Sequence, residues 1–123
     1  MRYMLLIYHN EHSREDLSPE ERTKSVSAAL NYIDEATQHG IFQAADPLEP
    51  ANTATTVRRQ DGKMMITDGP FAETKEQLAG YFILDCKDLD EALEWASKIP
   101  MVCGGGSGCV EVRPIRQLAP QAA

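Results

Sequence analysis

The stretch Arg2-Tyr3-Met4-Leu5-Leu6-Ile7-Tyr8-His9 (RYMLLIYH) decides the fold class of this chain. Its aromatic and branched side chains predict a β-strand over residues 2–9. Successive side chains of a strand point to opposite faces of its sheet, and here both sets are apolar: Tyr3, Leu5 and Ile7 on one face, Met4, Leu6 and Tyr8 on the other. Residues 80–86 repeat this pattern, so we expect a sheet with two apolar faces.

Two amphipathic helices are expected outside this strand. A Ser-x-x-Glu capping box at Ser18, with Pro19 at the first helical position, begins one helix, and Gly40 ends it. Asp88 caps a second helix that ends at Pro100. The apolar stripes expected to be buried are Val26, Ala29, Leu30, Ile33 and Ala36 in the first helix and Leu89, Ala92, Leu93, Ala96 and Ile99 in the second.

The remaining strands are expected at residues 41–44, 80–86 and 109–115, with a hairpin of residues 55–59 and 63–67 around Asp61-Gly62. The order of elements is strand, helix, strand, hairpin, strand, helix, strand. Right-handed crossovers then give an α+β, ferredoxin-like (split βαβ) antiparallel sheet with two helices on one face and an added β-hairpin.

Two helices on one face leave the other apolar face of the sheet open. Several hundred Å2 of exposed apolar surface is about the size that marks an interface. We therefore predict a homodimer through the sheet face, with a pocket where the two faces meet.

Length and charge narrow the functional classes. A chain of 123 residues, 42% of them hydrophobic, fits one domain over residues 1–123, with a frayed tail at 117–123. The net charge of −7 and a small basic cluster at Arg58-Arg59 argue against binding to nucleic acid. No apolar run approaches the roughly 20 residues that cross a membrane, and the first residues do not resemble a signal peptide, so a cytoplasmic location is expected.

The cysteines and glycines give no cofactor motif. Cys86, Cys103 and Cys109 cannot all pair within the chain, and their spacing matches no common zinc pattern, so no metal is expected. The glycines at 104–106 precede a strand and lack the Lys-Ser/Thr pair of a phosphate loop. No cofactor is therefore expected.

Several motifs resemble one known family. The sequences TDGPFAETKE at 67–76, LAGY at 78–81, LDEA at 89–92 and VEVRP at 110–114 occur in the order typical of the DGPF branch of the YCII-related family. The resemblance runs over nearly the whole chain. It implies a dimeric ferredoxin-like fold of the dimeric α/β-barrel superfamily.

The resemblance also implies a setting for function. YCII-related proteins are associated with a His-Asp pair in a cleft, and the superfamily includes isomerases, lyases and cofactor-free oxygenases. DGPF members are associated with sigma factors of the extracytoplasmic-function type. Residues 19–34 hold no histidine, so the histidine that YCII proteins carry in their first helix has no counterpart, and the His-Asp mechanism does not carry over unchanged.

Asp68 and His9 are the candidate catalytic residues. Asp68 heads the DGPF motif where a strand enters a loop, and with Glu73 and Lys75 nearby it could act as a general base. The alternative is that its carboxylate bonds the backbone of its own turn. His9 ends the first strand, where an imidazole could transfer protons near neutral pH or be a plain solvated residue.

The other candidate binding residues are Gly69, Pro70, Phe71, Glu73, Lys75 and Arg113. Phe71 could close over a ligand, or it could pin the loop to the core, which is the favoured alternative. Arg113 could bind an anion, or it could lie on the polar face of an edge strand.

These residues suggest three functions. The first is a cofactor-independent enzyme that acts on a small organic molecule by acid/base proton transfer, isomerase- or lyase-like, in a pocket at the dimeric sheet interface. The second is a non-catalytic small-molecule-binding or regulatory module associated with a sigma-factor system. The third is a purely structural dimer.

Overall fold

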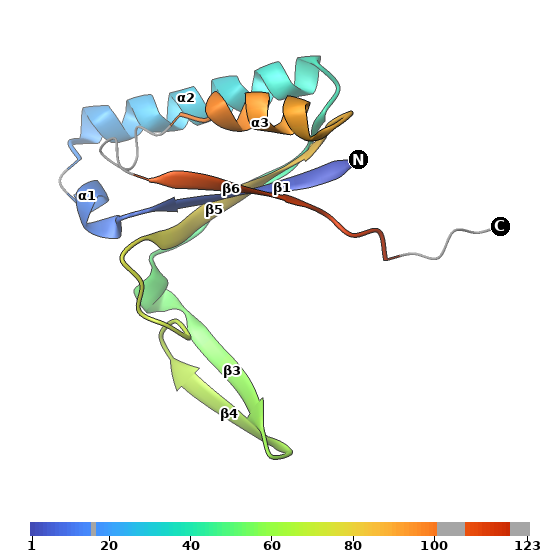
Figure 1. The fold of residues 1–123 in the computed structure, drawn as a ribbon. Coiled ribbons are helices and arrows are strands. Elements are labelled where there is room, and N and C mark those ends of the chain that lie inside the picture. Colours follow the sequence, from blue (N-terminus) through green and yellow to red (C-terminus); the bar gives the residue numbers. More distant parts are fainter. Residues whose placement is uncertain (16, 101–107, 119–123) are drawn as a thin grey trace.

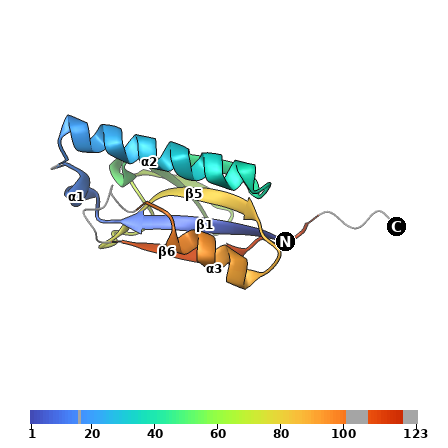
Figure 2. The same cartoon turned by 90° about the horizontal axis from the view of Figure 1, so that it is seen from above.

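A four-stranded antiparallel sheet forms the centre of the molecule, in a computed structural model that describes residues 1–15, 17–100 and 108–118. Its strands lie in the order β2 (Phe42–Pro47), β5 (Gln77–Asp85), β1 (Arg2–His9) and β6 (Cys109–Pro114). Helices α2 (Pro19–Gln38) and α3 (Leu89–Ser97) both lie on one face of this sheet (Figures 1 and 2). The predicted ferredoxin-like α+β fold is confirmed.

Both long helices begin at the predicted caps. The backbone N–H of Glu21 donates to the Ser18 hydroxyl over 3.1 Å, and the Glu21 carboxylate accepts from the backbone of Ser18 at 3.4 Å. At α3, the Asp88 carboxylate accepts from the backbone N–H of Glu91 at 2.9 Å. These bonds satisfy amide groups that lack partners within the helix, which explains why the chain turns into a helix at each point.

The core lies between the sheet and the two helices. Leu5 and Leu84 are fully buried in it. Three aromatic rings join the helices to the sheet: the Tyr32 ring lies 4.9 Å from that of Phe82 and 5.7 Å from that of Trp95, both edge to face. The Tyr32 hydroxyl donates a 2.8 Å hydrogen bond to the backbone oxygen of Trp95, which ties α2 to α3.

The predicted buried stripes of the helices are wrong at four positions: Val26, Leu30, Leu89 and Leu93 are exposed. The residues that α2 buries are Ser25, Tyr32 and Ala36, and those of α3 are Ala92 and Trp95. The large rings of Tyr32 and Trp95 bury more apolar area than an aliphatic side chain, and their mutual contact sets the rotation of both helices.

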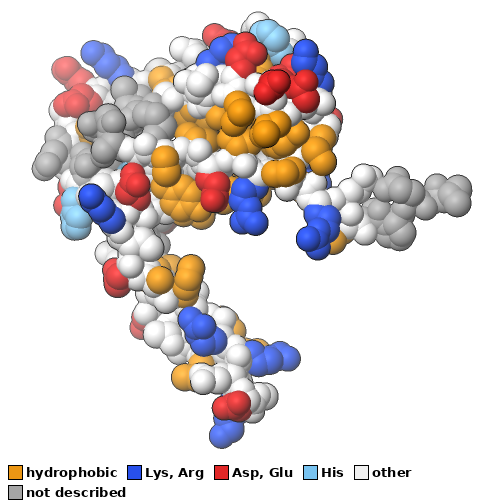
Figure 3. All heavy atoms as spheres, in the orientation of Figure 1, with side chains coloured by type: hydrophobic (Ala, Val, Ile, Leu, Met, Phe, Trp, Pro, Cys, Tyr) orange, Lys and Arg blue, Asp and Glu red, His pale blue; other side chains and the backbone are white. Residues whose placement is uncertain are grey.

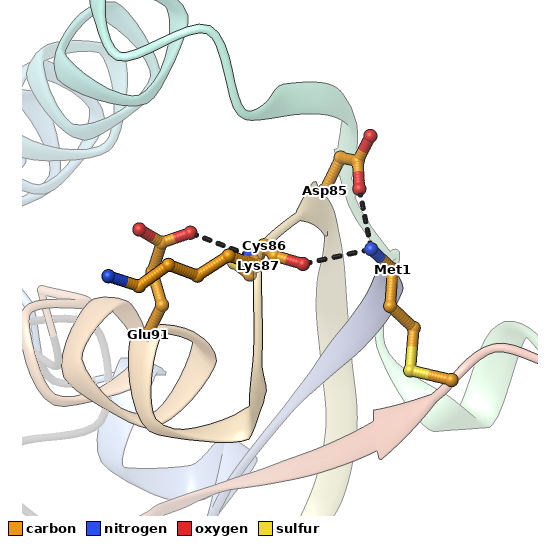
Figure 4. Close-up of polar contacts among 5 residues, drawn as sticks. All are labelled: Met1, Asp85, Cys86, Lys87 and Glu91. Atoms are coloured by element: carbon orange, nitrogen blue, oxygen red, sulfur yellow. Dashed lines mark hydrogen bonds and ion pairs between the residues drawn. The ribbon is translucent and has the colours of Figure 1, made fainter.

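The start of β1 is joined to the end of β5 (Figure 4). The Met1 ammonium donates to the Asp85 carboxylate at 3.1 Å and to the backbone oxygen of Cys86 at 2.9 Å. Nearby, the Glu91 carboxylate accepts from the backbone N–H of Lys87 at 3.0 Å. Burial, followed by the charges of Glu91 and Asp85, raises the pKa of the Cys86 thiol to about 11.

Among the described residues, no helix covers the second face of the four-stranded sheet (Figure 1). Strand alternation and register place Met4, Leu6, Tyr8, Tyr81 and Ile83 on this open face, and all five are half-buried. The predicted open apolar face is therefore present. None of the helices in the described ranges has the length and apolar character needed to cross a membrane.

A hairpin of β3 (Thr55–Gln60) and β4 (Lys63–Asp68) forms a separate two-stranded sheet. Its turn has positive φ angles at Asp61 (51°) and Gly62 (77°), as the Asp-Gly pair predicts. We call residues 55–68 the arm. Figure 1 shows the arm extending away from the four-stranded sheet on the side opposite α2 and α3.

Two short elements were not expected from the sequence: helix α1 (Glu11–Glu15) and a 3-10 turn, η1 (Ala51–Thr53). The Asn10 carboxamide oxygen accepts from the backbone N–H of His12 at 2.9 Å, which begins α1. Cys103 and the glycines at 104–106 lie outside the described residues, as do residues 119–123 of the expected tail.

Candidate functional site

A cleft of about 860 Å3 lies where β1 ends. Its walls come from six places: the end of β1, helix α1, helix α2, the link from β2 to η1, the end of β4 with the loop that follows it, and the start of β5. The residues that line it are His9, Glu11, His12, Glu15, Arg22, Pro47, Leu48, Glu49, Pro50, Ala51, Asn52, Asp68, Gly69, Pro70, Glu73, Gln77 and Ala79. Both predicted catalytic residues, His9 and Asp68, are among them.

His9 is a buried residue of this cleft, with 3% of its surface exposed. It follows Tyr3, Leu5 and Ile7 in the alternation of β1, so it lies on the helix-covered face of the sheet. The alternative of a plain solvated residue is therefore wrong. Helix α1, which the sequence did not reveal, begins two residues after His9 and lines the same cleft, so the strand end is not a surface position.

The second candidate catalytic residue, Asp68, is the exposed last residue of β4. None of the hydrogen bonds within residues 1–15, 17–100 and 108–118 involves its carboxylate. The turn is held instead by the backbone N–H of Gly69, which donates to the Ala54 oxygen at 2.7 Å, and by the Thr56 hydroxyl, which donates to the Gly69 oxygen at 2.8 Å. Gly69 has a φ of 98°, which favours glycine. The geometry thus gives Asp68 no structural bond in its own turn.

A hydrogen-bond network through Glu11 joins the walls of the cleft. The Glu11 carboxylate accepts from the backbone N–H of Ala51 at 2.7 Å, and its own N–H donates to the Gln77 side-chain oxygen at 3.0 Å. The Gln77 amide in turn donates to the Thr74 oxygen at 2.6 Å. Sequence reasoning missed Glu11 and Gln77, since no local pattern marks two residues that lie 66 positions apart and meet only in the folded chain.

An irregularity in β5 shapes the cleft wall beside β2. Ile7 pairs with Gly80 while Tyr8 pairs with Leu78, which leaves Ala79 as an extra residue. The Ala79 oxygen accepts from the backbone N–H of Leu48 at 2.7 Å, so it holds the β2 link against β5. A side chain at Gly80 would place its Cβ 2.7 Å from the Asp46 oxygen, so the close approach of the two strands requires glycine.

The described lining of the cleft is acidic. It holds five carboxylates, against the guanidinium of Arg22: Glu11, Glu15, Glu49, Asp68 and Glu73. Low-dielectric walls concentrate the field of such charges, so the cleft attracts cations and repels anions. The imidazoles of His9 and His12 also line the cleft.

The remaining predicted residues divide into two sets. Gly69, Pro70 and Glu73 line the cleft, whereas Phe71, Lys75 and Arg113 are not among its lining residues. The favoured alternative for Phe71 is wrong, because its ring is 77% exposed and does not pin the loop to the core.

Arg113 lies on β6, where it pairs with Met4 on the open face of the sheet. The open face also holds Tyr8, whose pKa is raised by burial and then by the charge of Glu111. In the described ranges, no three His, Cys, Asp or Glu side chains come together as a metal site would require.

Comparison with known proteins extends the sequence resemblance. A family model for the YCII-related domain matches residues 1–119. An uncharacterised protein of Rhizobium meliloti (strain 1021) is 34% identical over 120 residues, which are 98% of this chain and 96% of that protein. One similar solved structure, a complex with 2,5-dihydroxybenzoquinone, is the 5-chloro-2-hydroxyhydroquinone dehydrochlorinase of Burkholderia phenoliruptrix AC1100. It is 16% identical, with 90% of this chain and 91% of that one covered and a TM-score of 0.48.

Proposed function

We propose that this protein, which belongs to the YCII-related family, is a cofactor-independent enzyme that transfers protons on a small organic molecule bound beside His9. Within the family we assign it to the DGPF branch, on the motif at residues 68–71. One observation carries the proposal: the buried imidazole of His9 and the exposed carboxylate of Asp68 line the same cleft. The Asp68 carboxylate makes no hydrogen bond to the described residues. A pair of positioned proton carriers is what acid/base catalysis requires.

The proposed chemistry begins with proton abstraction. The imidazole of His9 takes a proton from a carbon of the substrate, and the electron pair of the broken C–H bond moves into a new double bond. In an isomerisation the proton returns at another atom, with Asp68 as the second carrier. In an elimination the electron pair expels a leaving group instead. Neither reaction changes the total oxidation level, so the residues of the chain can supply every proton that moves.

The shape and charge of the cleft suggest the substrate class. A volume of about 860 Å3 lies within the range of small-molecule sites. Five lining carboxylates against one guanidinium oppose the entry of an anion. We therefore propose a neutral or cationic substrate with an acidic C–H group, such as a small ketone or an aminoketone.

The proposal includes a homodimer in the cytoplasm. A second copy packed on the open face would cover Met4, Leu6, Tyr8, Tyr81 and Ile83, which none of the described helices covers. The site itself lies at the rim of the sheet, where the arm begins. A partner on the open face would then border the cleft on the side of Asp68.

Proton exchange tests the proposal without knowledge of the natural substrate. A panel of small neutral and cationic ketones is incubated with the protein in D2O, and loss of the α-proton signal is followed by 1H NMR. We expect exchange with at least one compound, and His9→Gln slows it by about a hundredfold or more. Lys75→Gln, outside the cleft, is the matched control and leaves the rate unchanged.

The same experiment separates the enzyme from the binding module. His9→Gln is checked for folding by circular dichroism, and His9→Asn provides a second variant. A compound that raises the melting temperature but shows no exchange above the protein-free rate would contradict catalysis. That outcome would favour a small-molecule-binding or regulatory module of a sigma-factor system.

A further inference from the structure

The arm exposes an apolar face. Strand pairing joins Val57 to Ile66 and Arg59 to Met64, so Val57, Met64 and Ile66 share one face of the hairpin with Arg59. Their exposed fractions are 60%, 61% and 68%. Figure 3 shows hydrophobic side chains along the arm, open to solvent, with basic side chains between them.

Within the described residues of one chain, the arm is weakly held to the rest of the molecule. A lone two-stranded hairpin is marginally stable in water, because it buries too little apolar surface. At the root of the arm, the Thr56 hydroxyl donates to the Gly69 oxygen, and the flanking residues Gly69 and Ala54 are joined by a backbone hydrogen bond of their own. A partner that covers Val57, Met64 and Ile66 would supply the missing burial.

The direction of the arm indicates which molecule covers it. The arm leaves the body on the side of the open sheet face, opposite α2 and α3 (Figure 1). A second copy packed on that face would lie beside the arm. Two-fold symmetry would place the partner's arm beside the first copy in the same way, so each copy would be held twice.

Charge supports the same partner. The arm holds Arg58, Arg59 and Lys63 against Asp61 and Asp68, a net charge of +1, so the remainder of a chain with net charge −7 carries −8. A basic arm is complementary to the acidic body of a second copy. Two acidic bodies would otherwise repel each other, and the arms would offset part of that repulsion.

We propose that the arm is a clasp that packs Val57, Met64 and Ile66 against the body of a second copy of this chain. This inference rests on the homodimer of the proposed function. Strand β4 runs directly into Asp68, so the clasp would also fix the position of one wall of the cleft. The partner would thereby help to shape the site.

Two adjacent methionines provide a matched pair of variants. Met64 lies on the apolar face, and Met65, 50% exposed, lies on the opposite face of the same strand. We expect Met64→Ser to raise the dimer dissociation constant by about tenfold or more, since it removes a large side chain that the clasp would bury. Met65→Ser should change it by less than about twofold. Sedimentation velocity over a range of protein concentrations measures both.

Cross-linking tests the contact directly. Benzoylphenylalanine at position 57 is irradiated in an equal mixture of unlabelled and 15N-labelled protein, and mass spectrometry identifies the joined peptides. Cross-links between a labelled and an unlabelled chain are expected, and cross-links confined to one chain would overturn the clasp.

The outcomes separate the clasp from the dimer. A wild-type protein that is monomeric at all concentrations contradicts both. A dimer that Leu6→Glu dissociates and Met64→Ser does not would overturn the clasp and leave the sheet-face dimer standing.

Discussion

The helix-covered face of the sheet and the arm contain similar residues in opposite surroundings. Leu5 and Leu84 are fully buried beneath α2 and α3, while Met64 and Ile66 stand more than half exposed on a hairpin of two strands. The difference is the number of layers, because an apolar strand face is stable only when a second layer covers it. Helices α2 and α3 supply that layer for the covered face of the sheet, and the proposed clasp would supply it for the arm from a second copy of the chain.

The sharpest test of this comparison is truncation of a core leucine beside an exposed one. Leu84→Ala should lower the free energy of unfolding by about 3 kcal/mol, because it leaves a cavity in a closed core. Leu93→Ala, on the exposed side of α3, should cost less than about 1 kcal/mol. Urea unfolding at fixed protein concentration measures both. Equal losses would mean that Leu93 is covered in the native assembly.

A second test uses pH to probe the edge of the core. The folded state holds the Cys86 thiol protonated, with its pKa raised from 9.0 to about 11, chiefly by burial. Its contribution to stability is complete below pH 9.0 and is lost as the pH rises toward 11.

Between pH 9.0 and about 11, the free energy of unfolding of the wild-type protein should fall, because the folded state resists ionisation of the thiol. In Cys86→Ala this fall should be smaller by on the order of 1–2 kcal/mol. The small cavity left by the substitution costs the same at every pH, so the slope isolates the thiol. An unchanged slope would show that the thiol ionises as freely in the folded state as in the unfolded one.

The sequence predicted those parts of the fold that are determined locally. Ser18, Asp88 and the Asp61-Gly62 turn act on their own neighbours, so their effects are visible in short stretches. The buried stripes of the helices were misplaced because the rotation of α2 depends on Trp95, which lies 63 residues from Tyr32. Helix α1 was missed because five residues are too short to show a helical period.

The residues of the candidate site also fall into two groups, those that the local sequence marks and those that it does not. His9 and Asp68 could be proposed because strand ends and a motif mark them, and the structure places both in one cleft. Glu11 and Gln77 could not, because their hydrogen bond joins segments that are distant in the sequence. The burial of His9 was also beyond prediction, since it depends on elements that fold over the end of β1.

The smallest expected effect concerns Asp68, at the root of the arm. Asp68→Asn should change the free energy of unfolding by less than about 0.5 kcal/mol, because the side chain is exposed and holds no hydrogen bond to the described residues. Thr56→Val removes the 2.8 Å bond to Gly69 and should cost about 1 kcal/mol, which makes it the positive control.

Denaturant unfolding at one fixed protein concentration compares the two, since the stability of a dimer depends on concentration. A loss of about 2 kcal/mol or more in Asp68→Asn would mark the carboxylate as a turn anchor, and the catalytic proposal would lose its second proton carrier. An unchanged stability together with slower proton exchange would place Asp68 in the chemistry. The arm would then end in a residue kept for function, at the boundary between the four-stranded sheet and the hairpin that we propose to pack on a second copy.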